Sequence, residues 1–402
     1  MDALLMLLAL PEIEKQTKGI TDTPREIHQQ PETWRNTFKT LQGMHAQLEY
    51  FLAETGLPAA PAEAPAVLLI GAGTSDYIGR SLSRLFRQQW QCEVMAVPST
   101  ELLTNMQDFL LEKKKYLWIS FSRSGDSSEG VAVLEQALQQ YPDQVRHLVV
   151  TCNRNGAMVQ KFAGQKNVLP VILDDAVNDR GLAMTSSFSN MVVAGQYLAY
   201  IRSPQEYAVL LEDLIAMGQT LLPAAAELTS NLAKTDFLKI CFLGTGALQA
   251  AAEESALKVM ELSAGRIHAI AQSALGLRHG PLASLDATTL IVAYISGNED
   301  RARYEMDLLK EIKEKRLGLA TVAVVPRRDK QWGQLVDYVL SMNAPISFPD
   351  ACRPPVDIIV AQLLGLFTSL QHGLQPDTPS PGGVINRVVS HINIYSPVVE
   401  NK

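Results

Sequence analysis

Short unbroken apolar runs recur along the chain and alternate with segments of helical periodicity. Such runs, about four to eight residues long, are typical of parallel strands covered by helices on both faces. Each half of the chain holds five of them. They lie at residues 67–70, 94–97, 116–121, 145–150 and 168–173, and again at 237–243, 267–270, 288–295, 319–325 and 336–340. The pattern predicts an α/β protein with two parallel sheets flanked by helices.

The two halves resemble each other at a nearly constant offset. Gly71 and Gly244 begin similar Gly-x-Gly turns, and the strand predicted at 94–97 has its counterpart at 267–270. The Ser-Gly pair at 124–125 recurs at 296–297. A regular spacing of this kind indicates an internal duplication.

Proline-rich stretches suggest where the segments of the chain meet. Pro58, Pro61 and Pro65 lie among alanines before the first sheet, and residues 376–381 hold a second break. Residues 384–395 are apolar enough that we expect them to pack back on the body. The expected segments are an N-terminal helical extension at 1–45, domains at 46–210 and 211–372, and a tail at 373–402.

Composition narrows the class of protein. A chain of 402 residues with 47% hydrophobic and 19% charged residues suits two or three well-packed domains. The 35 basic residues are scattered among 42 acidic ones, which argues against a nucleic-acid partner. The apolar run at residues 3–10 is too short to span a bilayer and has no basic segment before it, so we expect a cytoplasmic protein without a membrane partner.

The cysteines indicate neither a metal site nor a disulfide framework. They are far apart, and none belongs to a CxxC pair or a Cys/His cluster. We therefore expect reduced, mostly buried thiols and no bound metal. The four are Cys92, Cys152, Cys241 and Cys352.

A serine-rich segment follows the third apolar run and precedes a helical pattern. The hydroxyls of Ser122, Ser124 and Ser127, with amides freed by the flexibility of Gly125, can converge on an anion where the helix begins. This arrangement predicts a phosphate site. A serine-rich turn can also be no more than a helix cap, and the pattern alone leaves that alternative open.

A glycine turn at residues 71–75 could supply a second wall of that site. Its Gly-x-Gly resembles part of a dinucleotide fingerprint. However, the third glycine is displaced to Gly79, and the acidic Glu93 comes before the second strand rather than at its end. The sequence therefore disfavours a nucleotide site.

In the second half, the equivalent turn precedes a helix that carries Glu254, Lys258 and Glu261 at i, i+4 and i+7. Such a face is commonly solvated and ion-paired. The helix around it is rich in alanine and leucine, and burial there can raise a carboxylate pKa into the range useful for proton transfer. Both interpretations stay open on spacing alone.

Two further groups of residues could take part in chemistry. His279 lies in a tight turn before Gly-Pro, where an imidazole can shuttle a proton or serve only the turn. Arg180, Thr185, Ser186 and Ser187 precede a long helical segment and could bind a substrate or cap that helix.

These pieces together resemble the SIS (sugar isomerase) family of phosphosugar-binding domains, present twice, as in the isomerase half of glucosamine-6-phosphate synthase. The resemblance implies two tandem SIS domains, each a five-stranded parallel sheet of the flavodoxin-like αβα kind. It is carried by residues 71–75, 122–127, 254–262 and 278–281. More narrowly, the chain looks like AgaS-type proteins, the galactosamine-6-phosphate deaminases also labelled tagatose-6-phosphate ketose/aldose isomerases. That likeness is carried by residues 25–34, 179–187 and 386–389.

The resemblance also implies roles for single residues. Glu261 is the implied base for enolisation, with Lys258 catalytic beside it, and His279 assists ring opening, reaching the site of a neighbouring subunit. Only residues 295–298 stand where the first half has its serines, which implies one phosphate site per chain. The implied phosphate and substrate residues are Gly73, Thr74, Ser75, Ser122, Arg123, Ser124, Ser127, Arg180, Thr185, Ser186, Asn386 and Arg387.

Two departures from the synthase affect the expected reaction. The synthase ends in a catalytic lysine, whereas the matching tail offers Asn386 and Arg387. No glutaminase domain precedes the repeat in this sequence, so no ammonia is made on board. These departures favour a deaminase that converts galactosamine 6-phosphate to tagatose 6-phosphate and ammonia.

The expected protein is an enzyme without a metal or redox cofactor, working as a homodimer or larger homo-oligomer on a sugar phosphate. Plain aldose–ketose isomerisation of a hexose phosphate is the alternative reaction. A phosphosugar sensor is a further alternative. It is disfavoured because residues 1–60 show no basic helix-turn-helix pattern.

Overall fold

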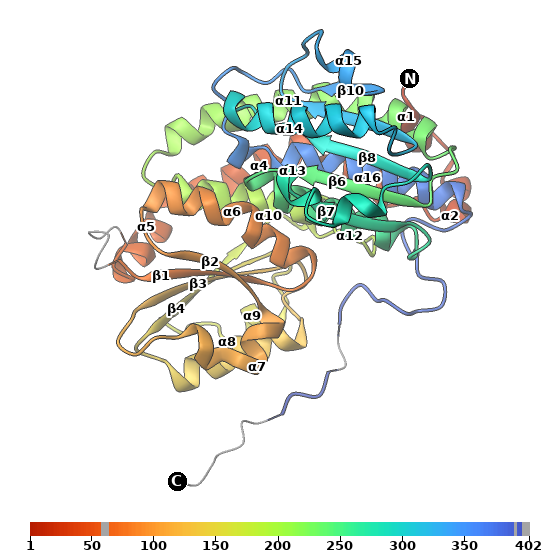
Figure 1. Cartoon of the computed structure of the whole chain (residues 1–402). Coiled ribbons are helices and arrows are strands. Elements are labelled where there is room, and N and C mark those ends of the chain that lie inside the picture. The colour runs from red at the N-terminus through yellow and green to blue at the C-terminus, as the bar shows by residue number, and fades with distance from the viewer. Residues whose placement is uncertain (58–63, 390–391, 396–402) are drawn as a thin grey trace.

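Two five-stranded parallel sheets form the framework of the protein (Figure 1). The structure is a computed structural model that describes residues 1–57, 64–389 and 392–395. We call the part around the sheet at 66–172 the first lobe and the part around the sheet at 239–341 the second lobe. All ten strands fall where the apolar runs predict them, which confirms the predicted fold class.

Five helices precede the first sheet and wrap around one side of the body. Pro58 and Pro61, two of the prolines of the expected linker, lie outside the described residues. The helices are α1 (Ala3–Leu8), α2 (Glu12–Lys18), α3 (Thr23–His28), α4 (Gln30–Gly43) and α5 (His45–Glu54).

The first lobe has the strand order β2-β1-β3-β4-β5, with every neighbouring pair parallel. Its central strands are buried along their whole length, as expected for a sheet covered on both faces. Its strands are β1 (Ala66–Gly71), β2 (Val94–Pro98), β3 (Tyr116–Ser122), β4 (Val145–Thr151) and β5 (Val168–Ile172). Its helices are α6 (Thr74–Trp90), α7 (Ser99–Phe109), α8 (Ser128–Gln140), α9 (Ala157–Gln160), the 3₁₀ turn η1 (Asp175–Val177) and α10 (Ser186–Ala199).

The second lobe repeats this topology in the order β10-β9-β8-β6-β7, so β6 corresponds to β1 and β8 to β3. Its strands are β6 (Lys239–Gly244), β7 (His268–Gln272), β8 (Thr289–Tyr294), β9 (Ala320–Val325) and β10 (Tyr338–Ser341). Its helices are α11 (Pro204–Leu232), α12 (Ala247–Leu262), α13 (Ala274–Leu277), α14 (Glu299–Glu314), α15 (Trp332–Leu335) and α16 (Pro354–Gln371), with 3₁₀ turns η2 (Pro281–Ser284) and η3 (Asp350–Cys352).

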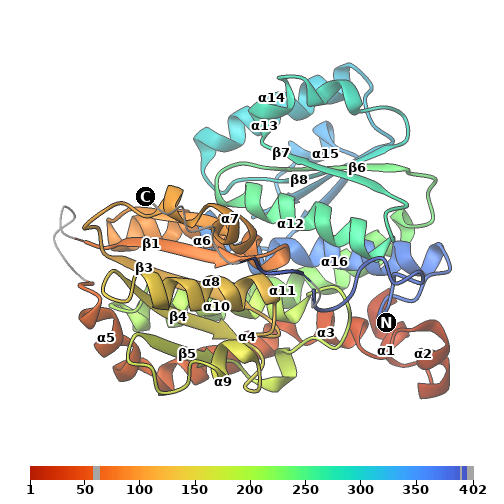
Figure 2. The same ribbon diagram turned by 90° about the horizontal axis from the view of Figure 1, so that it is seen from below.

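Helices α12 and α16 lie between the second sheet and the first lobe (Figure 2), where α6 packs on α12 and both α10 and α11 pack on α16. One continuous apolar core includes residues from both sheets and all five helices. Because α12 of the second lobe packs directly on α6 of the first, residues from the two lobes meet along this line. Where the domain boundaries lie stays a prediction.

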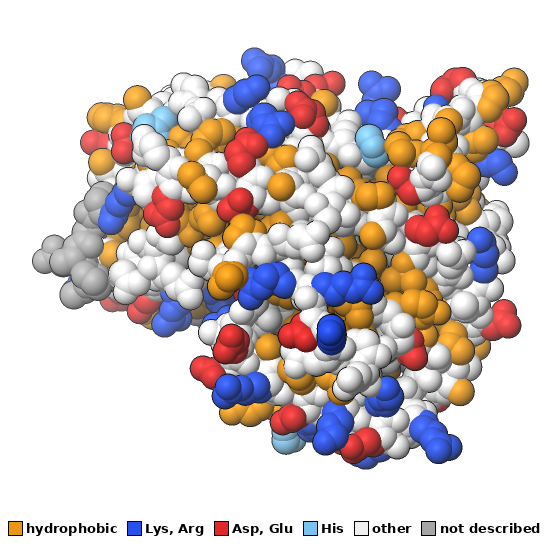
Figure 3. Space-filling model, turned by 90° about the horizontal axis from the view of Figure 1, so that it is seen from above, with side chains coloured by type: hydrophobic (Ala, Val, Ile, Leu, Met, Phe, Trp, Pro, Cys, Tyr) orange, Lys and Arg blue, Asp and Glu red, His pale blue; other side chains and the backbone are white. Residues whose placement is uncertain are grey.

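Helices α11 and α16 are long and apolar enough to cross a membrane by length and composition. In the structure, 89% of the most apolar stretch of α16 and 44% of that of α11 are buried within the body. Such helices are common in the cores of α/β proteins. In the space-filling view, acidic and basic side chains are interspersed and form no continuous basic surface on that face (Figure 3).

The expected packing of the tail on the body stays a prediction, because its described residues lie partly against the body and are partly exposed. Its apolar side chains Val384, Val389 and Tyr395 are exposed by 87%, 57% and 79%. Only parts of the described tail are anchored, and residues 392–395 are exposed. Polar atoms make the anchors: the Asp377 carboxylate accepts hydrogen bonds from the backbone of residues 21–23, and Arg387 donates to Asn178 and Asp179.

Candidate active site

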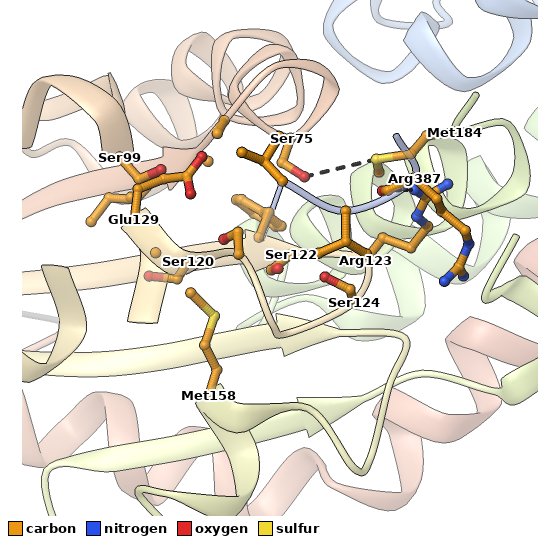
Figure 4. A pocket seen from close by; sticks show the side chains of 18 residues that line it. Ser75, Ser99, Ser120, Ser122, Arg123, Ser124, Glu129, Met158, Met184 and Arg387 are labelled. Carbon is orange, nitrogen blue, oxygen red and sulfur yellow. Dashed lines mark hydrogen bonds between the residues drawn. The ribbon is translucent and has the colours of Figure 1, made fainter. Parts of the chain in front are cut away.

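The serine loop after β3 forms one wall of a small cavity of about 120 Å³ at the carboxyl ends of the first lobe's strands (Figure 4). Ligands of parallel α/β sheets bind at this edge. The predicted residues Ser75, Ser122, Arg123, Ser124 and Ser127 all line it. We call this space the inner cavity.

The loop is built so that its hydroxyl hydrogens stay free. Gly125 N–H donates to Ser122 Oγ at 3.1 Å, and Asp126 N–H donates to Ser124 Oγ at 3.2 Å. Each serine oxygen thus already accepts a bond from the loop, and its own O–H remains available for an anion. Gly125 supports the loop with φ of +64°, a conformation that favours glycine.

Helix termini add favourable electrostatics. Ser127 occupies the N-cap position of α8, a helix of 13 residues, without making a side-chain capping bond, and Ser75 lies in the first turn of α6, a helix of 17 residues. The partial positive charge of a helix N-terminus favours an anion placed there. The inner cavity is therefore suited to a phosphate group in both size and charge.

Arg123 is less available to bind a phosphate than its position in the serine loop suggests. Its guanidinium is buried and donates to the carbonyls of Gly181 and Leu182 at 3.2 Å and 3.1 Å, and to the carbonyl of Arg387 at 2.6 Å. Burial, reinforced by the nearby charge of Arg387, lowers the pKa of Arg123. Its observed contacts hold the tail and the 181–182 segment against the cavity.

A larger cavity of about 930 Å³ adjoins the inner one, and we call it the outer cavity. The two share wall residues, including Ala72, Arg123, Met184 and Arg387. Gly73 and Thr74 line the outer cavity on the side of the first lobe, and Glu261 lines it on the side of the second. A sugar whose phosphate fills the inner cavity would thus extend toward Glu261.

The Glu261 carboxylate belongs to a buried cluster on α12. Lys258 Nζ donates to Glu261 and, at 2.9 Å, to Thr74 Oγ1 of α6, so the cluster crosses the boundary between lobes. Glu254 Oε1 lies 3.4 Å from the same Nζ. Glu254 and Lys258 are fully buried, which excludes the interpretation of this face as solvated, whereas the Glu261 side chain is 22% exposed.

Burial governs the protonation of this cluster. It raises the pKa of Glu254 to about 8, with Lys258 opposing and Glu261 adding to the shift. Burial also opposes the charge on Lys258, but the two carboxylates outweigh it and raise the pKa of Lys258 above 10.5. A protonated Glu254 reduces the number of charges buried in this cluster.

Close helix packing fixes the position of α12. A Cβ built on Gly365 of α16 would lie 2.6 Å from Leu262 Cδ1, so the two helices approach closely at this point. On the other side of α12, Arg80 of α6 bonds both Asp76 at 2.8 Å and Glu253 at 3.2 Å. The carboxylates of the second lobe are thus held rigidly against the first lobe.

Several predicted residues do not meet in these cavities. Thr185 and Ser186 are fully buried at the start of α10, where their hydroxyls and amides bond the Asp179 carboxylate. The sequence analysis allowed these residues to be either substrate ligands or helix caps. In the structure the side chain that caps α10 is the carboxylate of Asp179. Arg180 lies in a separate surface depression with Asp22, away from the serine loop.

The remaining predicted residues lie as follows. Asn386 lines the outer cavity and Arg387 lines both cavities. His279 is exposed in the turn after α13 and lines neither cavity of its own chain. Within the described part of the chain, no three His, Cys, Asp or Glu side chains are grouped as metal ligands would be.

Among the hydroxyl and carboxyl side chains that line the inner cavity, the sequence analysis did not assign Ser99, Ser120 and Glu129 to the site. Ser99 begins α7 directly after β2, so the rule that sites lie at strand ends could have found it. Glu129 gave no such signal, because a carboxylate beside an expected phosphate is counterintuitive. It is 4% exposed, and its Oε2 has no hydrogen-bond partner among the described residues.

Two parallel five-stranded sheets of the same strand order, with a serine loop and a carboxylate-bearing helix meeting between them, define a protein of the tandem SIS class. The SIS domain matches residues 232–367 of this chain. The chain is 33% identical over 376 residues to D-galactosamine-6-phosphate deaminase AgaS of Escherichia coli O157:H7, covering 93% of this chain and 96% of that protein. This chain belongs to the AgaS family.

Solved structures agree with this assignment. The crystal structure of tagatose-6-phosphate ketose/aldose isomerase from Escherichia coli superposes with a TM-score of 0.82 at 30% identity, covering 94% of this chain and 96% of that one. The C-terminal domain of glucosamine-fructose-6-phosphate aminotransferase from Francisella tularensis has a TM-score of 0.70 at 22% identity, covering 87% of this chain and 95% of that one. The latter likeness concerns the fold alone.

Proposed function

We propose that this chain is an amino-sugar phosphate deaminase and isomerase that converts galactosamine 6-phosphate and water to tagatose 6-phosphate and ammonia. The observation that carries the proposal is the adjoining pair of cavities, one suited to a phosphate and the other lined by Glu261. The names of its relatives, a galactosamine-6-phosphate deaminase and a tagatose-6-phosphate isomerase, support the same chemistry.

Phosphate binding orients the sugar. The free O–H groups of Ser122 and Ser124, with the start of α8, would bind the phosphate oxygens in the inner cavity. This anchor places the opposite end of the open-chain sugar in the outer cavity beside Glu261. Converting an encounter into a fixed geometry supplies a large part of the barrier reduction in such reactions.

Glu261 would act as the general base. Its carboxylate takes the proton from C2 of the open-chain aldehyde, giving an enaminol, and returns the proton to C1, giving a ketimine at C2. Water then adds to C2 and ammonia leaves, which produces the ketose. Lys258 fixes the Glu261 carboxylate through a direct hydrogen bond and is itself positioned by Thr74.

We also propose that the working unit is a homodimer or larger homo-oligomer in the cytoplasm, acting without a metal or redox cofactor and with no nucleic-acid or membrane partner. His279 would open the sugar ring in the site of a neighbouring subunit. This proposal is supported by its exposure and by the exposed apolar side chains of Leu275 and Met260 on the same lobe, at 49% and 44%. The four cysteines are free and buried, as suits a reducing compartment.

Plain aldose–ketose isomerisation is the second candidate, because the structural relative from Escherichia coli bears an isomerase name. It needs the same phosphate anchor and base but no amine. Incubation with galactosamine 6-phosphate, glucosamine 6-phosphate and a hexose 6-phosphate, followed by assays for free ammonia and ketose phosphate, separates the two reactions. Ketose formed from the hexose phosphate alone would favour the second candidate.

A Glu261→Gln variant tests the role of the base. We expect ammonia release to fall by about 10²–10⁴-fold, because general base catalysis typically contributes that factor. The dissociation constant for galactosamine 6-phosphate should change by less than about threefold, since the phosphate anchor is untouched. Glu314→Gln, an exposed carboxylate of α14 that lines neither cavity, is the matched control. Retained activity in the Glu261 variant would remove this residue from the mechanism.

A further inference from the structure

The second lobe keeps the architecture of the first lobe's phosphate loop. Asp126 N–H donates to Ser124 Oγ at 3.2 Å after β3, and Asn298 N–H donates to Ser296 Oγ at 3.1 Å after β8. Gly246 precedes α12 with φ of +70°, much as Gly73 precedes α6 with φ of +56°. Ser296 therefore occupies, in its own lobe, the place that Ser124 occupies in the first.

A carboxylate of the chain itself fills this second loop. Asp350 accepts hydrogen bonds from the Ser296 hydroxyl and from Gly297 N–H, the latter at 2.8 Å. Two guanidinium groups complete its surroundings, Arg301 at 3.4 Å and Arg353 at 3.3 Å. A hydroxyl, a backbone amide and two arginines form the donor set expected for a phosphate or another oxyanion.

The surrounding groups hold this arrangement in place. Arg353 is fully buried and donates to the Asp357 carboxylate at 2.8 Å and to the carbonyl of Ile295 at 2.5 Å. The backbone N–H of Ser296 donates a hydrogen bond to the Glu305 carboxylate at 2.8 Å. Asp350 itself is only 8% exposed.

An unfilled space lies directly outside Asp350. It is a cavity of about 290 Å³, lined by Gly246, Arg301, Phe348 and, from α6 of the first lobe, Arg84 and Gln88. Arg84 Nη1 lies 3.1 Å from the position that a Cβ on Gly246 would take. No carboxylate among the described residues lies within 4 Å of the Arg84 guanidinium.

We propose that Asp350 is the built-in occupant of a second oxyanion site between the lobes, so that the native chain binds one sugar phosphate and loss of this carboxylate opens the site to a small external oxyanion. The second lobe then serves to present α12 to the first lobe rather than to bind a second sugar. The inference rests on the proposed function in one respect: it assumes that the serine loop of the first lobe is the phosphate site.

Chemical rescue of an Asp350→Ala variant tests the site directly. Removing the carboxylate leaves Ser296, Gly297 and Arg301 without their buried acceptor, and we expect Tm to fall by several degrees. Sodium formate, a carboxylate small enough to enter the vacated space, should restore most of the loss, whereas sodium chloride at equal ionic strength should not. Asp307→Ala removes an exposed carboxylate from α14 and is the matched control, with no response to formate beyond that of the native protein.

A folded Asp350→Ala variant whose Tm responds to formate no more than the native protein does would overturn the proposal. If that variant does not fold, the Asp350→Asn variant tests the proposal instead. Asparagine keeps the shape of the aspartate side chain but places an amide N–H₂ among the N–H and O–H donors that surround residue 350. A Tm unchanged by this substitution would equally overturn it, and a Tm lowered by several degrees supports it.

Binding stoichiometry separates this inference from the proposed function. Calorimetric titration of the Glu261→Gln variant with galactosamine 6-phosphate should give one equivalent per chain. Two equivalents would refute the occupancy by Asp350. No binding at all would refute the proposed function, while formate rescue would still stand as evidence for the second site.

Discussion

The buried carboxyl of Glu254 should make stability depend on pH, and a Glu254→Gln variant should remove that dependence. Burial raises its pKa from 4.5 to about 8 in the folded protein. Between these two values the folded state holds a proton that the unfolded state releases. The free energy of unfolding therefore falls as pH rises from about 4.5 to about 8, and the loss is complete above pH 8.

The size of the effect follows from the pKa difference. One pKa unit corresponds to about 1.4 kcal/mol, so this group alone costs the native protein about 2–3 kcal/mol of unfolding free energy between pH 5 and pH 7. Glutamine has the shape of the protonated acid and cannot ionise. Its advantage over the native residue should thus grow across this range, by roughly 2–4 °C in Tm for a chain of this length.

Thermal unfolding by circular dichroism at pH 5, 6, 7 and 8 measures this difference. Glu253→Gln is the control: the neighbouring carboxylate is partly exposed and paired with Arg80, and its variant should stay at a constant offset from the native protein. Parallel Tm curves for Glu254→Gln and the native protein would refute the reasoning, because a carboxyl that ionises normally inside the cluster adds no slope.

Three further variants test the packing around the site. Gly71→Ala should weaken sugar phosphate binding at least about tenfold by calorimetry, because its Cβ would lie 2.2 Å from the backbone of Ser75 and must displace the start of α6. Asp179→Asn should cost about 3–5 kcal/mol in urea unfolding, since the fully buried carboxylate accepts all the bonds that cap α10. Gly195→Ala should cost about 1–3 kcal/mol, because its Cβ would lie 2.1 Å from Leu82 Cδ1, and adding Leu82→Ala should recover part of the loss.

Each of these variants has an outcome that contradicts it. Gly164→Ala, at a glycine with φ of +77° and open space around it, controls for a glycine replacement far from the site. Binding by Gly71→Ala equal to that of this control would show that the turn tolerates a side chain. A loss below about 1 kcal/mol for Asp179→Asn would show that the cap is dispensable, and strictly additive effects of the Gly195 and Leu82 changes would rule out their contact as the cause.

The sequence predicted the fold well because burial on both faces leaves a local mark. A run such as residues 116–121 is apolar throughout, and that property is readable without knowing its neighbours. The serine loop could be predicted for the same reason, because Ser122, Ser124 and Gly125 lie next to one another in sequence at the end of strand β3. The position of this loop at the carboxyl edge of the sheet then follows, because the loop directly follows a strand of a parallel sheet.

Residues whose roles depend on distant partners could not be predicted in the same way. The Glu254 carboxyl is fully buried only because α16 and α6 close on α12, whereas spacing along one helix favoured a solvated face. Asp179 is adjacent in sequence to Arg180, but only the fold shows that it receives the amides at the start of α10. Asp350 meets Ser296 across 54 positions, and no local pattern marks that contact.

The anchor between Asp377 and the start of α3 has a consequence for the order in which the protein matures on the ribosome. The carboxylate that binds Thr21 N–H is made 356 residues later, which at about 5–20 residues per second is a delay of roughly 20–70 s. During synthesis the first helices emerge long before their final partner exists. This contact of the N-terminal region must wait for translation to reach Asp377.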